Sequence, residues 1–272
     1  MLSKRILTAI LGLFIFYFFI NWGSLPFFII NIILILLGLR EFNLFIEKKY
    51  RSNLYILYFL GIIFSLYIYL NNINIIYIPF GFIFFLIIMF LFIYFQNKQG
   101  FENILISISL NLFAIIYIAG GLSFLVLLRD LKISFLGNTM ALWLVLLASW
   151  VTDTGAYFTG RFLGKNKLAP EISPNKTIEG AAGGVFFSFL AVILFFWFYN
   201  IFNYYLILYA ILIPVVAILG DLFESALKRD SGIKDSGNIL PGHGGVLDRF
   251  DSVIFTIPFT YFYLVFVNLI IN

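Results

Sequence analysis

Residues 221–251 read DLFESALKRDSGIKDSGNILPGHGGVLDRFD. This stretch holds six of the thirteen acidic residues of the chain, four of its seventeen Lys and Arg residues and its single histidine, His243. The chain as a whole is 62% hydrophobic. Charge concentrated between long apolar runs indicates that residues 221–251 join two apolar helices and carry much of the chemistry of the protein.

The composition predicts an all-α, polytopic integral membrane protein. Only 11% of the 272 residues are charged, and the mean hydropathy is +1.05, which excludes a water-soluble domain of ordinary composition. The apolar runs are about 15 to 25 residues long, enough to cross a hydrocarbon core of about 30 Å as helices. Strands of a membrane barrel would alternate and be half as long. The absence of cysteine excludes disulfides and thiolate metal sites.

The apolar runs predict nine transmembrane helices. They lie at about residues 6–22, 25–39, 54–70, 75–95, 104–128, 140–157, 180–199, 204–221 and 252–271. Gly120 and Gly121 in the fifth run would bend it or divide it. The polar residues from Arg40 to Arg51 are interpreted as a loop. We therefore divide the chain into about five N-terminal transmembrane helices, residues 1–139, and a catalytic transmembrane region, residues 140–272.

The basic residues predict which way the helices face. With the N-terminus in the cytoplasm, fifteen Lys and Arg residues fall in cytoplasmic segments, against two, Arg129 and Lys132, outside. This asymmetry places the polar loops 158–177 and 222–251 in the cytoplasm. Because the bases lie in short loops between spans, we read them as topology signals and expect no nucleic-acid partner.

Two groups of acids flank the stretch 221–251. Asp221, Glu224, Ser225 and Lys228 have the spacing i, i+3, i+4, i+7 and would share one helix face. Asp248 and Asp251 stand three residues apart on either side of Arg249. Such carboxylates are hard oxygen ligands that suit Mg²⁺ better than Zn²⁺. A merely solvated loop is the alternative, and the glycines at 242, 244 and 245, which permit close approach of a ligand to the backbone, count against it.

A second polar cluster covers residues 153–180. Asp153 would lie inside the membrane near the cytoplasmic end of its helix, where an acid is a functional candidate by default. Arg161, Lys165, Lys167 and Lys176 supply the positive charge that phosphate binding requires. Thr177 is a candidate N-cap for the next helix. Gly180 and Gly184, four residues apart, favour close helix packing over ligand contact.

These motifs resemble the signature of phosphatidate cytidylyltransferases, also called CDP-diacylglycerol synthases. The matching residues are Ser225 and Lys228-Arg229, Lys234-Asp235, and Leu240-Pro241-Gly242-His243-Gly244-Gly245 followed by Asp248-Arg249 and Asp251. Upstream, Asp153, Tyr157, Gly160-Arg161 and Gly164-Lys165, with Ser173-Pro174, Lys176-Thr177 and Glu179-Gly180, also resemble the pattern of that family. The resemblance covers residues 140–272, whereas residues 1–139 are similar only in being hydrophobic spans.

The resemblance implies transfer of the cytidylyl group of CTP to phosphatidic acid, giving CDP-diacylglycerol and pyrophosphate, in a Mg²⁺-dependent step with a second cation left open. The partners of the protein would be CTP, phosphatidic acid and membrane lipid. The resemblance is also compatible with a homodimer. The implied catalytic residues are Asp221, Asp248, Asp251, Lys228, Arg249 and His243. The implied metal ligands are Asp221, Asp248, Glu224 and Asp153. The implied substrate-binding residues are Lys176, Arg229, Arg161, Lys165, Ser225, Gly244 and Gly245.

Two other functions stay open at the level of sequence. A CTP-dependent polyprenol or phytol kinase, or an archaeal-type lipid cytidylyltransferase, would use a similar site on another lipid. A cation transporter would account for Asp153 and Asp221 in the membrane, but not for the polar stretch 221–251. For His243 we favour a hydrogen bond to a phosphate or a carboxylate over proton transfer, because a phosphate monoester is already ionised near neutral pH.

Overall fold

In the computed structural model the described residues are mainly helical, as the composition predicts. The structure describes residues 2–47, 50, 52–71, 104–137, 139–201, 203–237, 239 and 244–271. Among these residues, six helices are long and apolar enough to cross a membrane, at Ser24–Ile46, Leu105–Asp130, Met140–Leu163, Ile178–Phe198, Tyr204–Asp230 and Leu247–Ile271. The prediction of an all-α polytopic membrane protein is confirmed. The count of nine spans is not, and the run at 75–95 lies outside the described residues.

The chain forms two compact units that interleave in sequence. The first unit comprises residues 1–127 and Ser236–Val246, and the second comprises Leu128–Asp235 together with residues 247–272. The stretch 221–251 is therefore divided: Ser236–Val246 belongs to the first unit, and the residues on either side belong to the second. The division at residues 139 and 140 was a functional one and stays a prediction.

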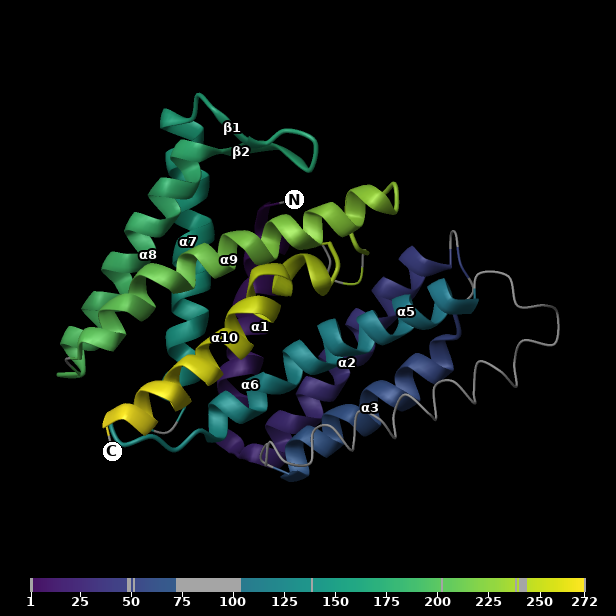
Figure 1. Cartoon of the computed structure of the whole chain (residues 1–272), viewed down its shortest axis with the longest axis horizontal. Coiled ribbons are helices and arrows are strands. Elements are labelled where there is room, and N and C mark those ends of the chain that lie inside the picture. The colour runs from purple at the N-terminus through teal and green to yellow at the C-terminus, as the bar shows by residue number, and fades with distance from the viewer. Residues whose placement is uncertain are drawn as a thin grey trace. The chain divides into compact units, whose positions relative to one another are not determined.

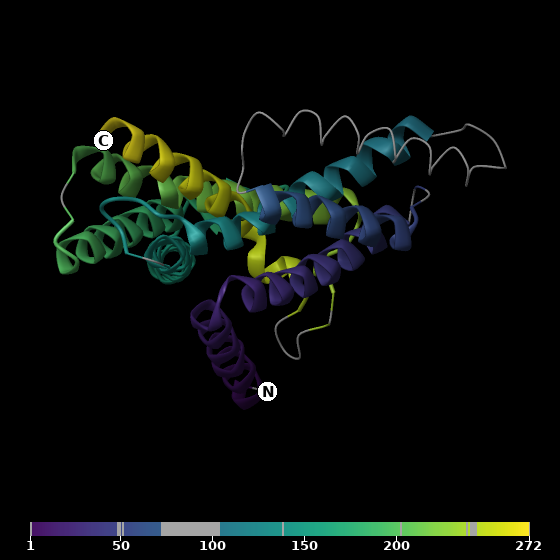
Figure 2. The same cartoon turned by 90° about the horizontal axis from the view of Figure 1, so that it is seen from below.

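The first unit is built on α2 (Ser24–Ile46), which packs against α1 (Leu2–Trp22) and α3 (Leu54–Asn71). Figures 1 and 2 both show α2 and α3 side by side. Ile35 and Leu39 of α2 are buried, and both lie against Gly61 of α3. Next come α5 (Ile104–Ala114), the π-helical turn η2 (Ile115–Gly120) and α6 (Gly121–Asp130). These three join into one helix, so Gly120 ends a π turn and the fifth apolar run is not divided.

The expected loop beginning at Arg40 is wrong in its first half. Helix α2 continues to Ile46, and Glu41 is buried, with 1% of its surface exposed. The physical reason is visible in the sequence, because Phe42, Phe45 and Ile46 continue the apolar face of the helix past Arg40 and Glu41 and are buried, as Glu41 is.

The second unit contains α7 (Met140–Leu163), α8 (Ile178–Phe198), α9 (Tyr204–Asp230) and α10 (Leu247–Ile271). Figure 1 shows α7 and α8 side by side, and α9 beside α10, as their contacts require. Figure 2 shows the pair α9 and α10 again, in green and yellow. Both predicted loops are shorter than expected: α7 runs on to Leu163, α9 runs on to Asp230, and α10 already begins at Leu247.

A small antiparallel hairpin occupies most of the remaining loop between α7 and α8. Strand β1 (Lys167–Ala169) pairs with β2 (Ser173–Thr177), with Lys167 opposite Thr177 and Ala169 opposite Ser173. Nothing in its polar sequence predicts strands. Thr177 ends β2 and caps α8, because its hydroxyl accepts a hydrogen bond of 3.1 Å from the amide of Gly180. The predicted N-cap is confirmed.

Helices α7 and α8 approach each other closely, and glycines permit this. A β-carbon added at Gly184 would lie 2.8 Å from the carbonyl oxygen of Thr152, and one at Gly180 would lie 2.9 Å from the carbonyl oxygen of Ala156. These distances fall on backbone atoms, which cannot turn away as a flexible side chain would. The expected packing role of Gly180 and Gly184 is therefore confirmed.

Buried hydroxyls join α10 to its neighbours within the membrane. The Ser149 hydroxyl of α7 lies 3.0 Å from that of Thr256, and the Tyr209 hydroxyl of α9 lies 2.9 Å from that of Thr260. All four side chains are buried. Hydrogen bonds of this kind supply part of the attraction that the hydrophobic effect does not supply between helices in lipid.

Replacing Gly184 by alanine should separate α7 from α8. We expect Gly184→Ala to destabilise the protein by about 1–3 kcal/mol, the usual cost of overpacking a tight contact, and to lower the thermal midpoint in detergent. Gly12→Ala is the matched control, because a β-carbon there has no neighbour within 4 Å. Equal midpoints for the two variants would contradict the packing role.

Candidate functional site

A cavity of about 710 Å³ lies in the second unit. It is lined by side chains from α7, both strands, α8, α9 and α10. Seven of the predicted site residues line it: Asp153, Arg161, Lys176, Asp221, Asp248, Arg249 and Asp251. Residues more than 90 positions apart in the sequence thus meet around one space, within the size range of small-molecule binding sites.

The helix α9 supplies the first acid. Asp221, Glu224, Ser225 and Lys228 all lie on this single helix, as their spacing predicts. Gly220 allows α9 to approach α10 here, since a β-carbon at that position would lie 2.9 Å from the carbonyl oxygen of Asp251. The glycine therefore brings Asp221 and Asp251 to the same level of the helix pair.

Lys176 and Asp221 form an ion pair inside the cavity. The ammonium nitrogen of Lys176, on β2, lies 2.5 Å from Oδ2 of Asp221, and each side chain keeps about a quarter of its surface exposed. Because both groups line the cavity, the hairpin and α9 meet through opposite charges on its wall. A phosphate entering the cavity would find this ammonium already positioned.

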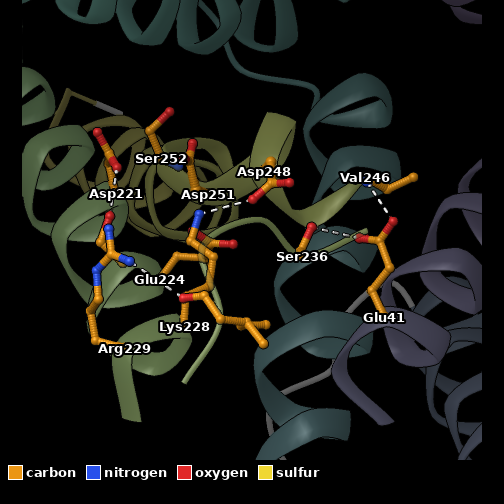
Figure 3. Close-up of polar contacts among 12 residues, drawn as sticks. Glu41, Asp221, Glu224, Lys228, Arg229, Ser236, Val246, Asp248, Asp251 and Ser252 are labelled. Carbon is orange, nitrogen blue, oxygen red and sulfur yellow. Dashed lines mark hydrogen bonds and ion pairs between the residues drawn. The ribbon is translucent and has the colours of Figure 1, made fainter. Parts of the chain in front are cut away.

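A second, more buried set of charges ties α9 to α10 (Figure 3). Lys228 forms an ion pair with Glu224, one turn before it, and its ammonium lies 2.9 Å from Oδ1 of Asp248. Glu224 is only 1% exposed. One lysine thus compensates two carboxylates where water is scarce, a position in which an unpaired charge is costly. Neither Lys228 nor Glu224 lines the cavity, whereas Asp248 does.

Asp153 and Asp251 reach the cavity from α7 and α10, and Ser252 lies between them. The Ser252 hydroxyl donates to Asp153 over 3.4 Å, and the Ser252 amide donates to Oδ1 of Asp251 over 2.6 Å. Figure 3 shows Asp251 and Ser252 near Asp221. Four carboxylates therefore face the same space as Lys176, Arg161 and Arg249.

Other predicted site residues lie outside the cavity lining. The Ser225 hydroxyl donates to Asp221 over 3.4 Å, and Nε of Arg229 donates to the carbonyl of Ile172 over 3.0 Å, which ties α9 to the hairpin turn. Lys165 contributes its backbone amide, which donates a hydrogen bond to Glu179. Gly244 and Gly245 belong to the first unit. His243, together with Pro241 and Gly242, lies outside the described residues, so its role stays a prediction.

Glu179 stabilises the turn before the hairpin, a role that its sequence position does not indicate. Its carboxylate accepts backbone hydrogen bonds of 3.0 Å from Lys165 and of 3.1 Å from Asn166, and a further bond of 2.7 Å from the Asn166 side-chain amide. The carboxylate thereby holds the turn that leads from α7 into the hairpin. Asn175 and Trp150 also line the cavity and were not assigned. Asn175 stands directly before Lys176 on β2, and the polar sequence does not predict that strand.

The cavity lining offers both carboxylate oxygens, which metal ions bind, and cationic side chains, which phosphates bind. Within the described parts of the chain, no three carboxylate or imidazole groups lie close enough together to hold a metal ion by themselves. Mg²⁺ does not require such a cage, because in phosphate-transfer sites it is usually held by one or two carboxylates together with substrate phosphates and water. The aspartates of the cavity supply such donors, and Lys176, Arg161 and Arg249 supply charge for phosphate oxygens.

Comparison with known proteins identifies the family to which the chain belongs. The model of the cytidylyltransferase family matches residues 3–267, which is nearly the whole chain. The phosphatidate cytidylyltransferase of Bacillus subtilis (strain 168) is 56% identical over 117 residues, covering 42% of this chain and 44% of the relative. Those of Staphylococcus haemolyticus and of Staphylococcus aureus (strain COL) are 55% and 52% identical over 114 and 111 residues.

The aligned portion spans less than half the length of these curated relatives: 44% of the proteins from B. subtilis and S. haemolyticus, and 43% of the protein from S. aureus. The family assignment rests instead on the match over residues 3–267. From that match and from the cavity, we conclude that this chain is a membrane-embedded member of the cytidylyltransferase family.

Proposed function

We propose that this protein transfers the cytidylyl group of CTP to phosphatidic acid, forming CDP-diacylglycerol and pyrophosphate. The observation that carries the proposal is the cavity in which Asp153, Asp221, Asp248 and Asp251 face Lys176, Arg161 and Arg249. Acids and bases in one cavity are what a reaction between two phosphate groups needs. The names of the relatives, each a phosphatidate cytidylyltransferase, support the same substrate pair.

The reaction joins two anions. An oxygen of the phosphatidate phosphate attacks the α-phosphorus of CTP, the new phosphorus–oxygen bond forms, and the bond to the β-phosphate oxygen breaks as pyrophosphate leaves. The attacking oxygen is already ionised, so no protein group has to remove a proton. The work left for the protein is to hold both phosphates together and to compensate their charge. We assign that work to Lys176, Arg161 and Arg249.

We include Mg²⁺ in the proposal, with Asp221 and Asp248 as the residues that would hold it together with substrate phosphates, and with Asp251 and Asp153 beside them. The ion would neutralise charge on the triphosphate and on the leaving pyrophosphate. Lys176 would neutralise Asp221 before the nucleotide binds and would bind a phosphate oxygen afterwards. Lys228 would keep Asp248 in place by holding its Oδ1 oxygen, which lies 2.9 Å from the lysine ammonium.

The fate of labelled phosphates tests this function. With purified protein, Mg²⁺ and phosphatidate, we expect label from the α-phosphate of CTP in the lipid product and label from the γ-phosphate in pyrophosphate. A CTP-dependent lipid kinase would instead place the γ-label in the lipid and release CDP. Ion flux without any use of CTP would favour the transporter. Either of these results would overturn the proposal.

The carboxylates of the cavity should be essential. We expect Asp221→Asn and Asp248→Asn each to lower kcat by at least about 100-fold, the scale of losing one preorganised electrostatic group. Asp230→Asn, at the exposed end of the same helix and away from the cavity lining, is the control and should keep its activity. Elution in size-exclusion chromatography verifies folding. Near-normal turnover of either cavity variant would refute its assignment.

The cytoplasmic orientation of the site is also part of the proposal, and it rests on the asymmetry of the basic residues. Because the chain has no cysteine, single cysteines can report topology without background. We expect Glu171→Cys, in the hairpin turn, to react with a membrane-impermeant thiol reagent only after the cells are opened, and Ser134→Cys to react in intact cells. The reverse pattern would contradict the orientation. Light scattering of the purified protein decides the oligomeric state, for which the resemblance to phosphatidate cytidylyltransferases is compatible with a homodimer.

A further inference from the structure

Glu41 makes contacts that neither its position in an apolar helix nor the proposed reaction explains. It belongs to α2, in the first unit, and its carboxylate is buried. Oε1 accepts a hydrogen bond of 2.8 Å from the backbone amide of Val246, and Oε2 accepts one of 3.0 Å from the hydroxyl of Ser236. Figure 3 shows both bonds converging on this one side chain.

Val246 and Ser236 are the two ends of a single segment, residues 236–246, which packs with the first unit. The segment contains the glycines and the histidine that resemble the family signature. Its preceding residues lead back to Lys228 at the end of α9, and Leu247 and Asp248 begin α10 directly after it. The Glu41 carboxylate therefore bonds both ends of a segment that lies in sequence between α9 and α10. These two helices carry Asp221 and Asp248 of the cavity lining.

The glycines at both ends make room for this carboxylate. A β-carbon at Gly237 would lie 2.9 Å from Oε1 of Glu41, with two more Glu41 atoms at 3.2 Å. A β-carbon at Gly245 would lie 1.9 Å from the Ser236 hydroxyl and 2.6 Å from Oε2 of Glu41. Gly245, which the sequence connects with the approach of a ligand, therefore lies against a side chain of the protein itself. Gly237 lies against the same side chain.

The neighbouring Gly244 has a different requirement. Its φ angle is +83°, in the left-handed region that favours glycine. Gly244 therefore shapes the backbone two residues before Val246, whose amide donates to the Glu41 carboxylate. The left-handed residue Gly244 and the residue bonded to Glu41, Val246, are thus only two positions apart.

We propose that Glu41 is a positioning residue, whose carboxylate holds the two ends of segment 236–246 together and thereby fixes the backbone that leads directly into Leu247, the first residue of α10. Glu41 is the first residue of the N-terminal half to receive a role. Its effect on turnover rests on the cytidylyltransferase function proposed above, whereas its effect on the segment does not.

The chemistry of the contact predicts that Glu41→Ala impairs the protein more than Glu41→Gln does. Glu41→Ala removes both acceptors. Glu41→Gln keeps one oxygen for the Val246 amide, and its amide group can donate to the Ser236 hydroxyl, which accepts as readily as it donates. A positioning role therefore predicts that glutamine rescues most of what alanine loses. A metal ligand or a group needed for its charge would not be replaced by a neutral amide.

Hydrogen exchange and turnover together test the proposal. In Glu41→Ala we expect faster exchange in the peptide that contains Val246, unchanged exchange in peptides of α7 and α8, and kcat/KM for CTP lowered about 10–100-fold, the range for residues that orient active-site groups. In Glu41→Gln we expect exchange and turnover within a few-fold of wild type. If Glu41→Ala does not fold, Ser236→Ala, which loses one of the two bonds, is measured in its place.

Gly237 offers an independent check, because the three nearest atoms to its added β-carbon all belong to Glu41. Gly237→Ala alone should lower turnover by crowding the carboxylate, and adding it to Glu41→Ala should cost little more, so the two effects should not add. Additive effects, unchanged exchange at Val246 in Glu41→Ala, or a glutamine variant as impaired as alanine would each overturn the proposal. If wild type itself forms no CDP-lipid, the proposed function fails, and the exchange result alone still decides the role of Glu41.

Discussion

The second unit depends on keeping ionised side chains compensated at the edge of an apolar medium. A carboxylate removed from water needs a cation or several hydrogen-bond donors, and loss of one partner of a buried pair typically costs about 3–5 kcal/mol. Lys228 meets this requirement for Glu224 and Asp248 at once, and Lys176 meets it for Asp221. Because these pairs join α9 to α10 and α9 to the hairpin, the same contacts that make the acids tolerable also assemble the cavity.

Helix packing sets the positions of these charges. Gly180 and Gly184 let α7 approach α8, and Gly220 lets α9 approach α10. Buried hydroxyls at Ser149 and Thr256 add directional contacts farther along the helices. Since lipid gives little driving force for helix association, small residues and hydroxyls have to supply it. The cavity thus lies where closely packed helices end and polar connections begin.

Much of this arrangement could be predicted from the sequence, because the relevant signals are local. Hydropathy marks the helices, and the spacing of Asp221, Glu224, Ser225 and Lys228 places them on one helix, as the structure confirms. The sequence places Glu41 in a loop, because a charged pair after an apolar run is typical of a helix end, whereas the helix continues to Ile46. The hairpin was missed because Lys167–Thr177 contains no alternation of apolar residues. Long-range partners such as Glu41 with Val246 carry no local signal, since 205 residues separate them.

The hairpin has a consequence for the chain lengths that this fold tolerates. Strand β2 ends at Thr177, whose hydroxyl already caps α8, so no spacer separates Lys176 from the helix. Successive side chains of a strand point to opposite faces, so one residue inserted between Lys176 and Thr177 would turn the lysine away from Asp221. The turn at Pro170 and Glu171 lies beyond the pairing of Ala169 with Ser173 and could lengthen without this effect. Homologous chains should therefore vary in length at the hairpin turn and stay invariant in length between the lysine and the helix.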